Sequence, residues 1–254
     1  MKPIRELSEP PQGLADYLRL VGDQAYWDEF RSHDSGAAYR ELVEELTSNQ
    51  HGLCAYCETS ISTERRQVEH VLPRSDEQRG KPLELDLSNL VACCLGVGRA
   101  EPGLAERSFA DAEPAREGSE ESCGQAKGSV WWTSFPEPRS LPPTPSLFTV
   151  SADGRIEVDE RACRDAGFRP EDAHCSLKTL NLNARRLRHA RHSQWNNLVD
   201  LSANVADETS MDTWIRTVLT PDERGRLQPF FTTSRSFFGR TGELVLAERP
   251  QNWI

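Results

Sequence analysis

Four of the seven cysteines have a spacing that could bind a single metal ion. Cys54 and Cys57 are separated by two residues, so both sulfur atoms can reach one tetrahedral zinc ion from a tight turn. A second pair would consist of Cys123 and one of the neighbours Cys93 and Cys94, and the spacing leaves open which neighbour contributes. In zinc-finger peptides such a site supplies about 10–16 kcal/mol of folding free energy, enough to hold short strands together. The alternative is that these are ordinary buried thiols, which predicts no bound zinc.

An acidic residue and a histidine, Glu69 and His70, stand together in a β-prone run that Pro73 ends. An imidazole with a pKa near 6.5 is suited to act as a general base at neutral pH. A carboxylate suits a hard divalent cation such as magnesium. Side chains alternate along a strand, so the two residues would share a site only if the end of the strand twists. On its own such a pair is usually exposed surface; the nearby cysteines favour a functional site.

Asn89 precedes the apolar run that leads to the later thiols. Its amide could brace the loop that holds His70, by accepting from or donating to the backbone of that loop. The alternative is that Asn89 is simply a turn residue after Ser88.

Composition limits the class of protein. The number of cysteines is odd and the sequence otherwise looks globular, which favours metal binding in a reducing cytoplasm over a disulfide framework. Hydrophobic residues make up 37% of 254 residues, and the mean hydropathy is −0.63. The sequence contains no run of about 18 apolar residues that could span a bilayer, and the start lacks the apolar stretch of a secretory signal. We therefore expect a cytoplasmic protein that does not enter the membrane.

The formal charge of −10 is unfavourable for a protein that contacts phosphates, but the charge is unevenly distributed. Residues 173–199 contain no acidic side chain, whereas acidic residues are concentrated between 101 and 121. The local field decides whether a polyanion can approach. The candidate nucleic-acid-binding residues in the basic stretch are Arg185, Arg186, Arg188 and Arg191. The alternative is the solvated face of a helix.

Periodicity and turn signals outline the elements that would position these residues. Apolar residues recur at helical spacing over residues 36–48, and helices are also expected at about 183–205 and 209–219. Asp153 and Gly154 separate two short β-prone runs and predict a hairpin. Residues 95–122 look like a surface insertion, residues 134–145 like a proline-rich linker, and the aromatic tail at 228–239 is expected to pack against the helices.

The resulting prediction is a mostly helical α+β protein in three parts. Residues 1–50 would form an N-terminal helical segment. Residues 51–135 would form the core, with the insertion at 95–122. Residues 136–254 would contain the linker, the hairpin and a C-terminal helical domain.

Six short segments together resemble the HNH nucleases of the ββα-metal class, and most closely the PtuB-type family associated with retrons and Septu anti-phage systems. The segments are Tyr39-Arg-Glu-Leu42, Gln50-His-Gly-Leu-Cys-Ala-Tyr-Cys-Glu58, Glu69-His-Val-Leu-Pro-Arg-Ser75, Asn89-Leu90 with Cys94, Cys123-Gly-Gln-Ala-Lys-Gly128 and Leu180-Asn-Leu-Asn183. The resemblance runs through most of the chain, but only the central third is specific. It implies a ββα-metal core with a four-cysteine zinc site, flanked by N- and C-terminal helices.

The resemblance also implies roles for individual residues. His70 matches the general base, Glu69 the acidic residue beside a catalytic Mg²⁺ or Mn²⁺, and Asn89 the middle asparagine. Cys94, rather than Cys93, falls with Cys123 where such nucleases carry their second zinc pair. The family usually has a metal-binding His or Asn directly after the last cysteine. This chain has Gly124 there, so Gln125 is the substitute ligand, and Lys127 could add a positive charge near the phosphate.

The function that this resemblance implies is metal-dependent hydrolysis of phosphodiester bonds, in DNA by default and with RNA as the other candidate. It further implies an anti-phage defence complex with a PtuA-type ATPase, related to SMC- and ABC-type enzymes. The alternative is a zinc-stabilised nucleic-acid-binding or adaptor subunit that is catalytically weak or has lost its catalytic metal site.

Overall fold

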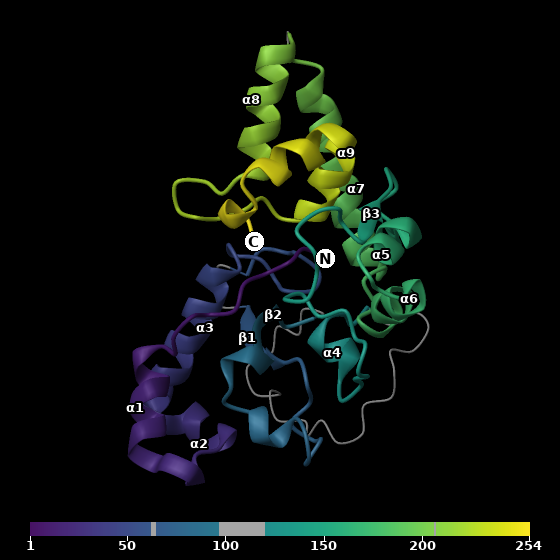
Figure 1. Cartoon of the computed structure of the whole chain (residues 1–254). Coiled ribbons are helices and arrows are strands. Elements are labelled where there is room, and N and C mark those ends of the chain that lie inside the picture. The colour runs from purple at the N-terminus through teal and green to yellow at the C-terminus, as the bar shows by residue number, and fades with distance from the viewer. Residues whose placement is uncertain (62–64, 97–119, 206) are drawn as a thin grey trace.

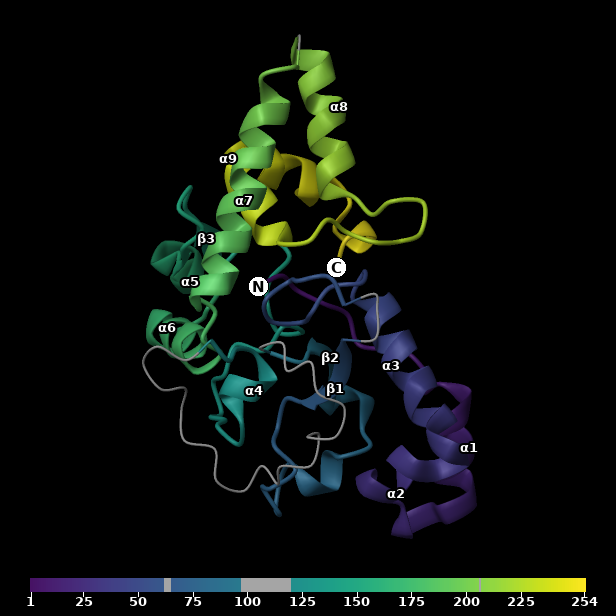
Figure 2. The same ribbon diagram turned by 180° about the vertical axis from the view of Figure 1, so that it is seen from behind.

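The computed structural model describes residues 1–61, 65–96, 120–205 and 207–254. Most of the expected insertion at 95–122 lies outside these residues. The described chain is an α+β fold rich in helices, with two small antiparallel sheets. Figure 1 shows α1 and α2 at one end, α8 at the other, and the strands β1 and β2 between α3 and α4; Figure 2 shows the same order from behind.

The N-terminal part consists of α1 (Gln12–Val21), α2 (Trp27–Ser32) and α3 (Ala37–Asn49). The periodicity at residues 36–48 correctly predicted α3. Its buried face, which includes Leu42, Val43 and Leu46, packs toward α1, α2 and both central strands. The same helix brings the chain directly to Cys54.

The central part contains β1 (Arg66–His70), β2 (Leu90–Cys94) and the single helical turn α4 (Gly124–Lys127). The two strands pair antiparallel with His70 opposite Leu90 and Arg66 opposite Cys94. This register sets the end of β1 beside the start of β2. All five side chains of β2 are buried, which explains why the sequence from Leu90 to Cys94 is apolar.

The expected hairpin is present as β3 (Phe148–Val150) and β4 (Ile156–Val158). Gly154 in its turn has a φ of +80°, and a Cβ there would collide with the backbone of Arg188. The hairpin therefore packs closely on α7.

The C-terminal part contains α5 (Glu160–Asp165), α6 (Pro170–Thr179), α7 (Arg185–Ser202), α8 (Glu208–Leu219) and α9 (Phe231–Glu248), which is kinked at Gly239. The aromatic tail packs as expected: the Trp195 and Phe237 rings lie 5.3 Å apart, and Trp214 and Phe238 4.9 Å apart. Leu53, beside the first cysteine pair, is buried in the same cluster as α8 and α9. Within the described residues, no helix is both long and apolar enough to cross a bilayer.

Candidate metal centre and histidine site

Four buried thiols converge from three parts of the chain. The sulfur atoms of Cys54, Cys57, Cys94 and Cys123 all lie within 4.8 Å of one another. The Cys57–Cys94 sulfur distance is 3.7 Å and the Cys54–Cys123 distance is 3.8 Å. Four sulfur donors in a tight group are the ligand set of structural zinc, so these residues fit the ion that the sequence analysis predicted.

Hydrogen bonds close the turn that carries the first two thiols and attach this turn to β2. The Glu58 N–H donates to the Cys54 carbonyl at 3.1 Å, and the Ala55 N–H donates to the Ala92 carbonyl at 3.1 Å. The buried Gln50 amide both donates to the Ala92 carbonyl and accepts from the Ala92 N–H, at 2.8 and 2.7 Å. Gln50 therefore fixes the distance between the turn and the strand that carries the third thiol.

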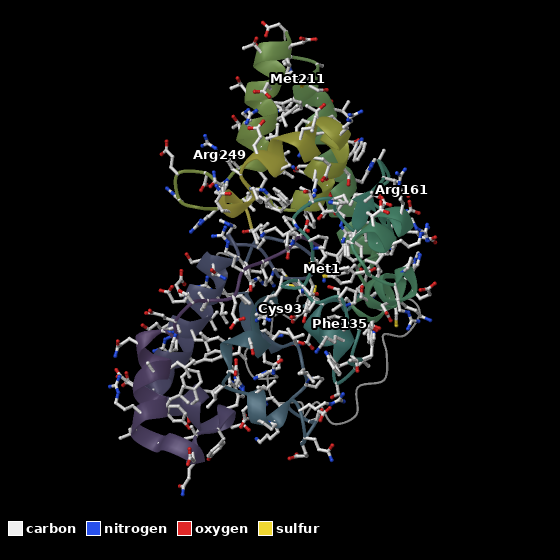
Figure 3. The ribbon with its side chains drawn as sticks, in the orientation of Figure 1. Met1, Cys93, Phe135, Arg161, Met211 and Arg249 are labelled. Atoms are coloured by element: carbon white, nitrogen blue, oxygen red, sulfur yellow. The ribbon has the colours of Figure 1, made fainter. Side chains whose placement is uncertain are left out.

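Cys94 belongs to the group of four, and Cys93 lies beside it. The Cys93 sulfur is 3.7 Å from that of Cys54, and Figure 3 shows Cys93 in the middle of the molecule. Burial raises the pKa of the Cys54 and Cys123 thiols, whereas hydrogen bonds from Cys123 and Cys54 lower the pKa of Cys94. Because zinc binds thiolates, loading this site releases protons.

His70, the last residue of β1, is held in one orientation. Its Nε2 lies 3.0 Å from the Glu84 carbonyl oxygen, and its ring meets the edge of Trp27 at a centroid distance of 4.5 Å. A carbonyl can only accept, so Nε2 carries the hydrogen and Nδ1 carries the lone pair of the neutral ring. Burial, assisted by the charges of Arg74 and Lys127, lowers the pKa of His70 to about 3. The imidazole is therefore unprotonated at neutral pH.

Asn89 is buried and makes the contacts expected of a brace. Its Oδ1 accepts from the Leu72 N–H at 2.7 Å, and its Nδ2 donates to the carbonyls of Leu72 and Leu83 at 3.1 and 3.3 Å. The Val71 N–H also donates to the Asn89 carbonyl at 3.0 Å. These bonds hold both ends of the loop that follows His70.

Glu69 forms a buried ion pair. The Lys127 ammonium, whose side chain is 1% exposed, lies 2.9 Å from Glu69 Oε1 and 3.0 Å from the His70 carbonyl. A Cβ at Gly124 would lie 2.8 Å from the Glu69 carboxyl carbon. Gly124 therefore leaves the space that this carboxylate fills, and Lys127 joins α4 to the end of β1.

The described residues around Glu69 do not fit a catalytic divalent cation. One carboxylate oxygen is paired with Lys127, and the carboxylate is packed against Gly124. Gln125, the substitute ligand, packs its side chain against Gly96. Within the described residues, the four cysteines form the one group of three or more Cys, His, Asp or Glu donors that could hold a metal.

Two of the four basic residues predicted for nucleic acid are occupied within the fold. Arg191 is 3% exposed and donates to the Leu182 carbonyl at 2.8 Å. Arg186 donates to the Glu120 carbonyl at 3.2 Å and to the Ser122 hydroxyl. Arg191 is thus withdrawn from solvent, whereas Arg186 is partly buried and its donors are used within the fold.

The other two basic residues are accessible. The side chain of Arg185 is 92% exposed, and that of Arg188 is 40% exposed and paired with Asp153. Both line an open cavity of about 450 Å³ at the start of α7, together with Asp153, Asn183, His189 and His192.

Two residues near the imidazole were not singled out as site residues from sequence. Trp27 contacts the His70 ring, and Arg74 lies over Trp27 with its guanidinium 5.9 Å from the ring centroid. Arg74 stands in the same short segment as His70, so its position was available as a signal. Trp27 lies far away in sequence, and no sequence pattern linked it to His70.

The fold and the site define a helix-rich α+β protein with a candidate four-thiolate metal centre and a partly buried histidine at the end of a two-stranded ribbon. Comparison with known proteins shows which proteins of this class the chain resembles. The chain is 29% identical over 203 residues to the proposed HNH endonuclease of retron Ec83 from Escherichia coli, an alignment that covers 75% of this chain and 78% of that protein. It is 27% identical over 193 residues to the proposed HNH endonuclease of retron Vc95 from Vibrio cholerae, covering 74% and 80%. No protein-family profile matches the chain. The chain thus resembles retron-associated HNH endonucleases, as the sequence segments indicated.

Proposed function

We propose that this protein is an HNH-type endonuclease that hydrolyses phosphodiester bonds in nucleic acid, with DNA as the preferred substrate. The observation that carries the proposal is the fixed orientation of His70, whose Nε2 is bound to the Glu84 carbonyl and whose Nδ1 is free to accept a proton. The similarity to two retron-associated proteins supports the same chemistry.

In this proposal His70 acts as the general base. Nδ1 takes a proton from a water molecule as the water oxygen forms a bond to phosphorus. The bond from phosphorus to the 3′-oxygen breaks on the opposite side, and the leaving 3′-oxygen takes a proton from solvent water. An anionic phosphate near the ring raises the low pKa of His70 by favouring the imidazolium, so the base becomes stronger when substrate binds. Asn89 positions the loop that follows His70, and Lys127 holds the backbone carbonyl of His70 at the end of β1.

The resemblance implies Mg²⁺ or Mn²⁺ at Glu69, but the pairing with Lys127 gives that ion no described ligand set. No step of the proposed mechanism therefore passes through it. The zinc ion would have a structural role, because it would join the first cysteine turn, β2 and the start of α4, and so keep β1 in place.

The test is cleavage of supercoiled plasmid and of a labelled duplex by purified protein. We expect His70→Ala to abolish cleavage while the zinc content and the thermal unfolding of the protein stay unchanged. His174→Ala, which alters an exposed histidine on α6, is the matched control and should cleave normally. Cleavage by His70→Ala at the wild-type rate contradicts the proposal.

The second candidate, a binding or adaptor subunit without activity, is favoured by two observations. Gly124 stands where the resemblance places a metal ligand, and Glu69 is neutralised by Lys127. Full nucleic-acid affinity without cleavage, in chelator and in several divalent cations, identifies this alternative.

On the resemblance alone, we also propose that the protein acts in anti-phage defence with a PtuA-type ATPase. Co-expression of the chain with a PtuA-type ATPase, followed by size-exclusion chromatography, tests this partnership. Separate elution of the two proteins at micromolar concentration counts against it.

A further inference from the structure

We infer that the guanidinium of Arg74, rather than a divalent cation at Glu69, binds the phosphate that is attacked by the water molecule that His70 deprotonates. This inference rests on the proposed function and names the cation of that site. It starts from the two faces of β1: the chain places Glu69 with Lys127 and Gly124, and His70 with Trp27, Glu84 and Arg74.

Arg74 and His70 are brought together by two shared neighbours. The Trp27 and His70 ring centroids lie 4.5 Å apart with the rings nearly perpendicular, and the Arg74 guanidinium lies 5.9 Å from the Trp27 ring centroid. Glu84 contacts both residues: its carbonyl accepts from His70 Nε2 at 3.0 Å, and its Oε2 lies 3.7 Å from Arg74 Nη1. The base and the guanidinium thus flank the same indole and the same loop residue.

Accessibility separates Arg74 from the other nearby cation. The Arg74 side chain is 27% exposed, whereas that of Lys127 is 1% exposed. Within the described residues, both ion-pair contacts of Arg74, to Asp28 and Glu84, use Nη1. The N–H groups of Nη2 and Nε are therefore left to donate to a phosphate.

Asp28, which would compete with a phosphate for the Arg74 guanidinium, forms only a weak ion pair with it. Asp28 lies 3.1 Å from Nη1, but its side chain is 64% exposed, and ion pairs in such positions contribute little. A phosphate can accept two parallel hydrogen bonds from a guanidinium, which is a stronger and more specific arrangement. Asp28 and Glu84 then orient the guanidinium before substrate arrives, and Arg74 stabilises the charge that grows on phosphorus-bound oxygen as water attacks.

The experiment compares wild-type protein with Arg74→Ala, Arg74→Lys and Arg79→Ala on a labelled duplex. Arg79 is the matched control, because it lies in the same loop, is 56% exposed and also forms an ion pair, with Asp76. Single-turnover rates and duplex affinity are measured in zinc-loaded protein that has been freed of unbound metal by gel filtration, with and without Mg²⁺. We expect Arg74→Ala to lower the rate at saturation about 100-fold, as loss of one oxyanion-stabilising donor does in other enzymes. Its duplex affinity should fall far less than its rate, because the guanidinium should interact more strongly with the transition state than with the bound substrate.

Arg74→Lys should recover part of the rate, because lysine keeps the charge but not the planar fork. Arg79→Ala should cleave at the wild-type rate. Wild-type protein should also cleave without added divalent cation. A second readout needs no activity: Mn²⁺ titrated into wild-type and Glu69→Gln protein should give the same free-ion signal by electron paramagnetic resonance.

Wild-type cleavage that Arg74→Ala leaves unchanged overturns the inference. So does Mn²⁺ binding that Glu69→Gln removes, or cleavage that occurs only with divalent cations and needs Glu69. Failure of wild-type protein to cleave under every condition overturns the proposed function itself, which is a different result.

Discussion

At the scale of single residues, Gly124 and Glu69 depend on each other. A Cβ at Gly124 would press on the Glu69 carboxylate, which is held by Lys127. We expect Gly124→Ala to destabilise the protein by about 1–3 kcal/mol, the usual cost of overpacking. In a Glu69→Ala/Lys127→Met background, where the carboxylate and its partner are absent, the same change should cost much less. Urea unfolding of the four proteins gives the coupling energy, and equal penalties in both backgrounds would show that Glu69 does not set the identity of residue 124.

The pKa of His70 makes a prediction about stability. The folded protein disfavours the imidazolium, so the pKa falls from the ordinary 6.5 to about 3. Between these two values the unfolded chain binds more protons than the folded chain, so this residue stabilises the fold fully above pH 6.5 and loses that contribution as the pH falls toward 3. The effect is on the order of 3–5 kcal/mol. His70→Gln should lack it: urea unfolding from pH 4 to 8 should show a steeper rise for wild type, and parallel curves would contradict the prediction.

At the scale of elements, the four thiols join a turn, a strand and a helical turn that lie far apart in the sequence. We expect one zinc ion per chain and none in Cys94→Ser, whereas Cys93→Ser and the exposed Cys175→Ser should keep the ion. Binding contributes about 4 kcal/mol of stability when free zinc exceeds its dissociation constant a thousandfold, so chelation should lower the melting temperature. Metal analysis and thermal unfolding check both statements. Retention of zinc by Cys94→Ser together with its loss from Cys93→Ser would reverse the ligand assignment.

Elements with strong local signals were predictable from sequence, and elements defined by distant contacts were not. The periodic apolar face of α3, the Asp153-Gly154 hairpin and the helices α7 and α8 are local patterns, and they appear close to where they were expected. The aromatic tail was expected to pack, but its sequence did not reveal the 18-residue helix α9, which contains two glycines. The pairing of Glu69 with Lys127 could not be read from sequence at all, because it depends on α4 returning to the end of β1.

At the scale of the whole molecule, burial divides the arginines of α7 into accessible and internal side chains. Spacing along the sequence grouped Arg185, Arg186, Arg188 and Arg191 as equals. In a helix only part of the circumference faces solvent, so Arg191 is buried under the hairpin while Arg185 is exposed. The cavity at the start of α7 adds His189 and His192 to the exposed pair. Local sequence patterns cannot give this division, because it depends on where the β3–β4 hairpin packs.

The division of the α7 arginines into exposed and buried side chains predicts that substituting the exposed ones affects duplex binding, whereas substituting the buried one affects stability. If the start of α7 contacts phosphates, Arg185→Ala/Arg188→Ala should weaken duplex binding and reduce the slope of log K against log salt by about 1.8, because each lost phosphate contact removes about 0.9. Stability should be unchanged. Arg161→Ala/Arg164→Ala on α5 removes the same charge from exposed positions and should leave the slope as it is. Arg191→Ala should instead lower stability by about 3 kcal/mol, because buried carbonyls lose their donor. An unchanged slope in Arg185→Ala/Arg188→Ala, measured by fluorescence anisotropy from about 50 to about 200 mM salt, would remove this surface from the nucleic-acid path and leave the Arg74 side of the molecule to bind the substrate alone.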